Sequence, residues 1–277
     1  MLIDTHAHLW WPSYYPVAQD QPGYFDELEQ VLERAKKAGV EKMIVPGTDI
    51  ESSRKAVELA RKYPGVIYAG VGIHPEEVLR ANYNEETPFA CRRALLDLQS
   101  GIPFRESPRE IVAIGEIGTD AYTKEMQKCM EEQKVLFKIQ CELALELDLP
   151  VIIHTRNSLS EALEVLDQLP QMPRGQFHCF SHDEEGVKQV LSRGFYVSFC
   201  GNITWSKRVA RLVVMVPDDR LLLETDSPFM WAGKRNESAN VAILAEMIAG
   251  LRGGLRGDSS QVIEQITTEN AIRLFRL

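Results

Sequence analysis

Residues 150–156 read PVIIHTR, an apolar run that passes directly into a histidine, a threonine and an arginine. A short continuous apolar run is typical of a strand that is covered on both faces in a parallel sheet. Similar runs occur elsewhere, including VIYAGVGI at 66–73 and RLLLE at 220–224, with amphipathic segments between them. This alternation predicts βα units around a parallel sheet.

Eight segments fit the strand pattern, and helical periodicity or end signals mark the segments between them. The predicted strands are Leu2–Thr5, Lys42–Val45, Val66–Val71, Ile111–Ile114, Pro150–Ile153, Gly175–Phe177, Phe195–Phe199 and Leu221–Glu224. The predicted helices are Phe25–Ala38, Ser52–Lys62, Met126–Leu147, Ser160–Gln168, Glu184–Ser192, Ser206–Val214, Ala239–Leu251 and Gln261–Leu274, with a further small helix at Pro88–Gln99.

Eight strands with helices between them favour an α/β TIM (β/α)₈ barrel, formed as a single domain over residues 1–277. An open doubly wound sheet is the alternative. No G-x-G-x-x-G motif follows a predicted strand, so a dinucleotide-binding fold has no support.

The charge balance limits the classes of partner. The net charge is −9, and 26% of the residues are charged. An acidic chain has no global attraction to nucleic acid or to an anionic membrane, which argues against a protein that grips long DNA through a basic surface. The charge leaves open an enzyme that meets phosphate through bound metal ions.

The sequence also indicates a compartment. No secretory signal is visible, and no run of 18 apolar residues predicts a membrane span. The five cysteines form no C-x-x-C pair, so we expect reduced thiols rather than disulfides or a thiolate zinc site. We therefore expect a cytoplasmic protein, and no segment suggests a membrane or stable protein partner.

Polar side chains gather at the ends of the predicted strands. Five of the six histidines and two carboxylates follow apolar runs in this way; they are His6, His8, His74, Glu116, His154, His178 and Asp226. In a barrel of this class all of these strand ends point to one mouth, where the active site lies. Chance placement of seven unrelated residues explains this pattern poorly.

The residue types indicate metal-assisted hydrolysis. His6 and His8 are two positions apart on a strand and so project to the same face, toward one cation. Imidazoles and carboxylates together suit two divalent ions, which we take to be Zn, Mg, Mn, Fe or Ni. Such an ion lowers the pKa of bound water to about 7. Glu116 can bridge two ions, and Asp226 can hold one while its free oxygen accepts a proton. Neither serine nor cysteine has a nucleophile-elbow context, so a covalent mechanism is disfavoured.

With these residues placed, the sequence resembles the TatD-like DNase family of the metal-dependent amidohydrolase superfamily. The resemblance covers nearly the whole chain through IDTHAHL, GVGIHPEE, AIGEIGTD, PVIIHTR, HCFSH, VSFCGNIT, LLLETDSPF, GKRNESAN and TTENAIRLF. It implies a TIM-barrel hydrolase of ester bonds, most often the phosphodiesters of DNA. Glu116 fits this group better than the phosphotriesterase-like relatives, which carry a carboxylated lysine on the fourth strand.

The resemblance also implies roles for single residues. The implied metal ligands are His6 and His8 for one ion, His154 and His178 for the other, Glu116 for both, and Asp226, which is also the acid/base. His74 resembles the residue that contacts the scissile phosphate. Arg156 and Asn236 fall in matching motifs without a firm role.

Three departures from the family pattern leave the substrate open. His182 replaces the common glycine after HCFS; it could contact phosphate, but we expect it to be exposed. Thr119 stands where an apolar residue is usual, and the connection Leu79–Glu110 is long.

Features around the mouth allow two interpretations each. Trp10, Trp11, Tyr14 and Tyr15 could stack bases, but a self-packed lid is slightly favoured. The cations that could form a basic patch or a solvated helix face are Lys207, Arg208, Arg211, Lys234 and Arg235.

The leading hypothesis is a deoxyribonuclease or phosphodiesterase that takes a nucleic acid or small phosphodiester at the mouth. The alternative is a hydrolase of a carboxylic ester, lactone, amide or mischarged aminoacyl-tRNA. A non-enzymatic scaffold is the third interpretation, and the complete set of expected ligands argues against it.

Overall fold

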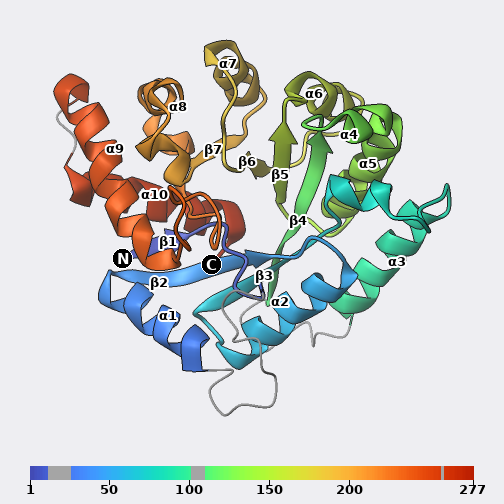
Figure 1. Ribbon diagram of the computed structural model, residues 1–277, viewed down its shortest axis with the longest axis horizontal. Helices are drawn as coiled ribbons and strands as arrows, with labels where there is room; N and C mark the ends of the chain where they lie inside the picture. The colour runs from blue at the N-terminus through green and yellow to red at the C-terminus, as the bar shows by residue number, and fades with distance from the viewer. Residues whose placement is uncertain (12–25, 101–109, 257–258) are drawn as a thin grey trace.

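The eight strands form one parallel sheet that curls into a barrel. The computed structural model describes residues 1–11, 26–100, 110–256 and 259–277 (Figure 1). Neighbours in the sheet follow the order of the chain, from β1 to β8. The strands are β1 Leu2–Asp4, β2 Val40–Pro46, β3 Ile67–Val71, β4 Ile111–Asp120, β5 Val151–Arg156, β6 Gly175–Phe177, β7 Tyr196–Phe199 and β8 Leu221–Leu223.

The barrel is closed by the segments that follow β1 and β8. Ala7 and Ser227 form a parallel bridge, and the Thr5 N–H donates to the carbonyl of Leu223 at 3.1 Å. The predicted TIM barrel is therefore confirmed. The extent of the domain over all 277 residues includes segments outside the described ranges and stays a prediction.

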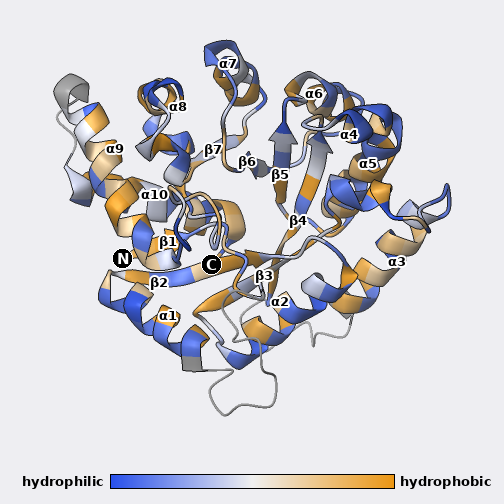
Figure 2. Ribbon diagram, in the orientation of Figure 1, coloured by the Kyte–Doolittle hydropathy of each residue, from blue (hydrophilic) through white to orange (hydrophobic). Residues whose placement is uncertain are grey.

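Helices lie outside the strands, with their hydrophilic residues on the outer surface (Figures 1 and 2). The described helices are α1 Asp26–Lys37, α2 Ile50–Lys62, α3 Thr87–Ser100, α4 Lys124–Lys128, α5 Met130–Glu146, α6 Leu159–Asp167, α7 Glu184–Ser192, α8 Lys207–Leu212, α9 Val241–Arg256 and α10 Ser260–Phe275. Short 3₁₀ helices lie at Pro75–Leu79, Gly201–Thr204, Val213–Met215, Asp218–Arg220 and Ser238–Asn240.

Local chemistry explains several helix ends. Asp49 begins α2 with a capping box, because its side chain accepts from the Ser52 N–H at 2.7 Å while the Ser52 hydroxyl accepts from the Asp49 N–H at 2.9 Å. Gly39 and Gly194 follow α1 and α7 with φ of +83° and +84°, a backbone conformation that glycine adopts without steric cost.

The barrel interior is apolar at one end and polar at the other. Ile152 faces an inner cluster that includes Ile3, Ile44 and Leu222 and is covered by α10 through Phe275. His154, two residues later on β5, projects to the same side as Ile152 but nearer the end of the strand. Along β5 the inner face therefore changes from the packed core to the polar site within two residues.

Two predicted strand ends need the largest corrections. The fourth and fifth strands were predicted to end at Ile114 and Ile153, but β4 runs to Asp120 and β5 to Arg156. The extra pairs are Ile117 with Ile153, Gly118 with His154, Thr119 with Thr155 and Asp120 with Arg156. The polar residues that we expected after these two strands therefore lie within them, because their backbones continue the pairing of β4 with β5.

The predicted helix Met126–Leu147 is divided at Cys129 into α4 and α5. The Gln133 side chain ties this break to the end of β4. Its amide donates to the carbonyl of Met126 at 2.8 Å and its oxygen accepts from the Asp120 N–H at 2.7 Å. In the described ranges, none of the helices is both long enough and apolar enough to cross a bilayer.

Candidate active site

The first of two donor groups lies where the barrel closes, between the segments that follow β1 and β8. The Nε2 atoms of His6 and His8 are 3.1 Å apart. Each lies 3.4–3.6 Å from Asp226 Oδ1 and 3.4–3.5 Å from Glu116 Oε2. We call these four residues the closure group.

The second donor group faces the other oxygen of the same carboxylate. Glu116 Oε1 lies 3.0 Å from His154 Nδ1 and 2.8 Å from His178 Nε2, and those two ring nitrogens are 3.2 Å apart. We call Glu116, His154 and His178 the strand group. Glu116 thus belongs to both groups, with one oxygen in each.

Backbone geometry places the two carboxylates. Gly118 follows Glu116 closely on β4 with φ of +147°, and a Cβ there would lie 2.0 Å from the carbonyl oxygen of His154. Only glycine allows this approach of β4 to β5. Asp226 itself has a φ of +57°, an uncommon left-handed conformation, while its N–H donates to the His6 carbonyl at 2.8 Å.

The electrostatics of the site favour an ionised Glu116. Burial alone would raise its pKa, but the imidazoles of His178 and His6 outweigh burial and hold the pKa well below its usual range. Asp226 is also ionised, because the hydrogen bond from His8 and the neighbouring imidazoles outweigh burial and lower its pKa. Despite burial, the carboxylates in turn raise the pKa of His8, His154 and His178, so the buried site places ionised carboxylates against imidazoles.

His74 enters the same space as a neutral hydrogen-bond donor. Burial, and then the neighbouring His154, lower the pKa of His74 to about 3. Its Nδ1 accepts from the Glu76 N–H at 3.2 Å, so the ring proton is on Nε2. Nε2 lies 3.6 Å from Glu116 Oε1, beside the strand group.

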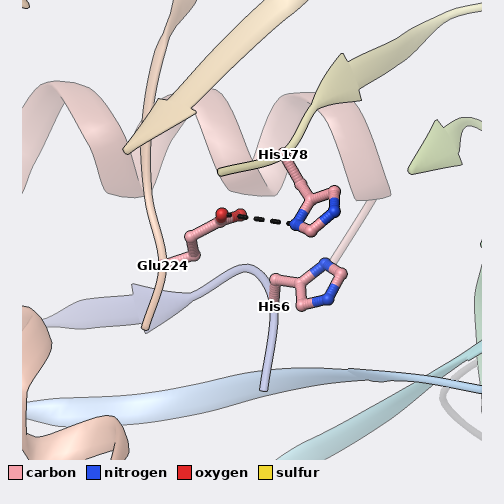
Figure 3. Close-up of side chains that lie close together, drawn as sticks. All are labelled: His6, His178 and Glu224. Atoms are coloured by element: carbon pink, nitrogen blue, oxygen red, sulfur yellow. Dashed lines mark ion pairs between the residues drawn. The ribbon is translucent and has the colours of Figure 1, made fainter. Parts of the chain in front are cut away.

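Two carboxylates that the sequence analysis did not assign lie behind the strand group. Asp120 Oδ2 is 3.0 Å from His154 Nε2, and Glu224 Oε1 is 3.6 Å from His178 Nδ1. Glu224 is also fixed by a hydrogen bond of 2.6 Å from the Ser198 hydroxyl. Figure 3 shows the Glu224 carboxylate pointing at the His178 ring, which stacks on His6 with centroids 4.0 Å apart. Asp120 and Glu224 end the GEIGTD and LLLE motifs, which was the available signal.

The donor atoms fit divalent cations. If the Nε2 atoms of His6 and His8 both carried protons, these protons would face each other across 3.1 Å. A cation removes that conflict. Neighbouring ligands of an ion held at about 2.0–2.2 Å lie about 3.0–3.5 Å apart, close to the 2.8–3.6 Å separations within the two groups. The structure therefore brings together every residue that the sequence predicted as a metal ligand.

A cavity of about 880 Å³ opens onto both groups. Trp10 and Trp11 line it, as predicted for residues near the mouth, and Phe229 stacks edge-on against Trp11 at 4.9 Å. Tyr14 and Tyr15, and part of the long connection Leu79–Glu110, lie outside the described residues. Arg208 is the member of the predicted basic patch that lines the cavity; the others, Lys207, Arg211, Lys234 and Arg235, are not among its lining residues.

Two of the three departures in sequence, His182 and Thr119, now have partners. His182 was expected to be exposed, but it is partly buried, and its Nε2 lies 2.8 Å from the Thr155 hydroxyl. Thr119 is buried and its hydroxyl donates to the Ser158 hydroxyl at 2.9 Å. Asn236 is buried as well and donates to the carbonyl of Thr225 at 2.8 Å, which supports the segment before Asp226.

Two thiols border the strand group. Cys179 Sγ and Cys200 Sγ are 3.0 Å apart as free cysteines. The hydrogen bond with Cys200 and burial raise the pKa of Cys179 well above its usual value, and burial raises the pKa of Cys200. Because the thiolate is the nucleophile, neither group is activated for covalent chemistry.

Comparison with known proteins gives consistent matches over the full length. The family model described as TatD related DNase matches residues 3–276. A Bacillus subtilis protein named as the metal-dependent hydrolase YabD is 36% identical over 284 residues, which cover 100% of both chains. The 3'-5' ssDNA/RNA exonuclease TatD of Erwinia billingiae is 32% identical, over 90% of this chain and 93% of its own.

Solved structures agree in fold. The TatD homologue YJJV of Escherichia coli superposes with a TM-score of 0.81 at 29% identity, covering 100% of this chain and 98% of its own. A TatD-family hydrolase of Entamoeba histolytica superposes with a TM-score of 0.75 at 21% identity, covering 99% of this chain and 97% of its own.

Proposed function

The chain belongs to the family of TatD-related DNases, and from this premise we propose that it is a divalent-metal-dependent nuclease or phosphodiesterase that acts through the residues around Glu116. One observation carries this proposal. Glu116 is buried and ionised, and each of its oxygens faces a separate set of imidazoles. A carboxylate in this position suits a shared ligand between two cations.

The proposed ligand sets follow the two groups. His6, His8 and Asp226 would hold one ion, His154 and His178 the other, and Glu116 both. When bound, such ions supply positive charge to the phosphate oxygens and make hydroxide accessible at neutral pH. Elemental analysis of the purified protein distinguishes Zn, Mg, Mn, Fe and Ni as the bound ion.

The protein's own groups supply proton transfer and orientation. Asp226 is ionised and lines the cavity, so it can accept a proton from the attacking water. His74 presents an N–H at Nε2 and is neutral, so it can donate a hydrogen bond to an oxygen of the scissile phosphate without competing for a cation.

The substrate proposal draws on relatives and on the cavity. Several relatives are named as exonucleases of single-stranded DNA and RNA, which supports a nucleic-acid substrate here. The cavity that opens onto both groups is lined by aromatic and basic side chains that suit bases and phosphates. A cytoplasmic location and the lack of a stable protein partner stay predictions.

The test compares two aspartates that flank β8. Asp226→Asn removes the proposed proton acceptor at the mouth and should lower kcat on single-stranded DNA and on bis(p-nitrophenyl) phosphate by about 10²–10⁴-fold. Asp219→Asn makes the same chemical change before β8, where the side chain is exposed and pairs with Arg220, and should leave kcat unchanged.

The same assay should include a lactone and an aminoacyl ester. Faster turnover of either one than of any phosphodiester, lost in Asp226→Asn, would replace the proposed substrate class while keeping the site. Wild-type turnover by Asp226→Asn on DNA would overturn the site itself.

A further inference from the structure

Arg156 is a cation that lines the cavity beside the strand group. It lies at the end of β5 and lines the cavity, and among the described residues its guanidinium makes no ion pair. Two other lining cations are neutralised: Lys55 pairs with Glu51 at 2.8 Å, and Arg80 pairs with Asp49 at 2.9 Å. The donors of Arg156 are therefore available to an anion in the cavity.

The guanidinium is nevertheless held in place. It lies over the ring of Tyr122, 3.4 Å from the centroid. A stacked guanidinium keeps its N–H edges open for planar, bidentate contacts with a phosphate. A cation that is already stacked on a ring, here the platform formed by Tyr122, loses less conformational entropy on binding a ligand than a mobile cation does.

The platform is connected to the metal-ligand set. Asp120 Oδ1 accepts from the Tyr122 N–H at 2.7 Å, while Asp120 Oδ2 lies 3.0 Å from His154 Nε2. One carboxylate thus orients both the strand group and the segment that carries the Tyr122 ring. The position of Arg156 is consequently set relative to the proposed site of cleavage.

The spacing along β5 indicates what Arg156 would contact. His154 and Arg156 are alternate residues of one strand, so they project to the same side. Two residues span about 6.6 Å along a strand. This step is of the same order as the distance between neighbouring phosphorus atoms of a nucleic-acid strand.

We propose that Arg156, stacked on Tyr122, binds the phosphate next to the scissile phosphate. The proposal rests on the proposed function and deepens it. It assigns the substrate as a chain with at least two consecutive phosphates, in preference to an isolated phosphodiester. Neither the family model nor the names of the relatives assign this residue.

The experiment compares a substrate that has one phosphate with substrates that have two. The substrates are a dinucleoside monophosphate, the corresponding trinucleotide, and trinucleotides in which one phosphate at a time is a neutral methylphosphonate. The metal-loaded wild-type enzyme should prefer the trinucleotide, and neutralising the neighbouring phosphate should lower kcat/KM roughly tenfold, the scale of one charge-assisted hydrogen-bond pair.

Arg156→Ala should lower kcat/KM on the all-phosphate trinucleotide roughly tenfold, mainly through KM, and leave the dinucleoside monophosphate unchanged. The effects of Arg156→Ala and of the neutral neighbouring phosphate should not add. In the variant, replacing that phosphate by a methylphosphonate should leave kcat/KM unchanged. Lys188→Ala removes one positive charge from an exposed pair with Glu185, away from the cavity lining, and is the control, with no such loss expected.

Tyr122 provides an independent check. Tyr122→Phe keeps the ring and should behave as wild type, whereas Tyr122→Ala removes the platform and should raise KM for the trinucleotide only. If Arg156→Ala lowers turnover of both substrates equally, or keeps the methylphosphonate effect, the subsite is wrong. Wild-type protein without turnover of any phosphodiester would instead overturn the proposed function.

Discussion

The two donor groups share Glu116 but are supported in different ways. In the strand group, the outer nitrogens of His154 and His178 face the carboxylates of Asp120 and Glu224 at 3.0 and 3.6 Å. In the closure group, the Nδ1 atoms of His6 and His8 are buried, and within the described ranges they form neither a hydrogen bond nor an ion pair. His178 Nδ1 also lacks a hydrogen bond, but it has the Glu224 ion pair.

The closure group is supported through its backbone instead. The buried Asp4 carboxylate accepts from the N–H and hydroxyl of Thr225 at 2.9 and 2.7 Å, and from the His6 N–H at 3.3 Å. The Asp226 N–H donates to the His6 carbonyl. Carboxylate side chains therefore orient the imidazoles of the strand group. The imidazoles of the closure group are positioned through the backbone of the segments after β1 and β8, which we call the barrel seam.

The largest effect should come from the residue that the two groups share. Glu116→Gln removes the charge that both cation sites need, so we expect metal content to fall in both. Turnover should fall roughly a thousandfold, because several kcal/mol of transition-state stabilisation correspond to about one factor of ten per 1.4 kcal/mol. Elemental analysis and kinetics on one preparation measure both. Full occupancy of either site would show that Glu116 is not shared.

A more selective change should affect the strand group alone. Asp120→Asn keeps the acceptor for the Tyr122 N–H but removes the negative charge beside His154. Loss of such a partner typically costs about 10–100-fold in metal affinity. Calorimetric titration of metal-free protein should show one weakened and one unchanged site. Asp167→Asn, at a surface pair with Arg193, is the control. Equal weakening of both sites would contradict the division into two groups.

The smallest effect should come from the seam. Thr225→Val keeps the shape of the side chain but removes its hydroxyl from Asp4. We expect the free energy of unfolding to fall by about 1–3 kcal/mol, with little change in the metal affinity of the strand group. Urea denaturation of metal-free protein measures the first, and the calorimetric titration the second. An unchanged midpoint would mean that Asp4 does not hold the seam.

The barrel and the residues of the two donor groups could be predicted from the sequence because both depend on short-range patterns. Apolar runs locate the strands, and the residues after them, such as His178, can be read from the chain. The predicted strands were too short at β4 and β5, where glycine and polar residues continue the strand beyond its apolar run.

The roles of the residues that support the site could not be derived from the sequence, for a physical reason. Asp120 and Glu224 stand at the ends of recognisable motifs, but their roles depend on which ring each one faces after folding. The pairing of Asp4 with Thr225 joins positions 221 residues apart. Strand and helix periods are local, so the chain was enough to predict the fold and the residues that lie together at the mouth. Which oxygen of Glu116 faces which imidazoles, what orients those rings, and where Arg156 lies depend on contacts that exist only once the barrel has closed.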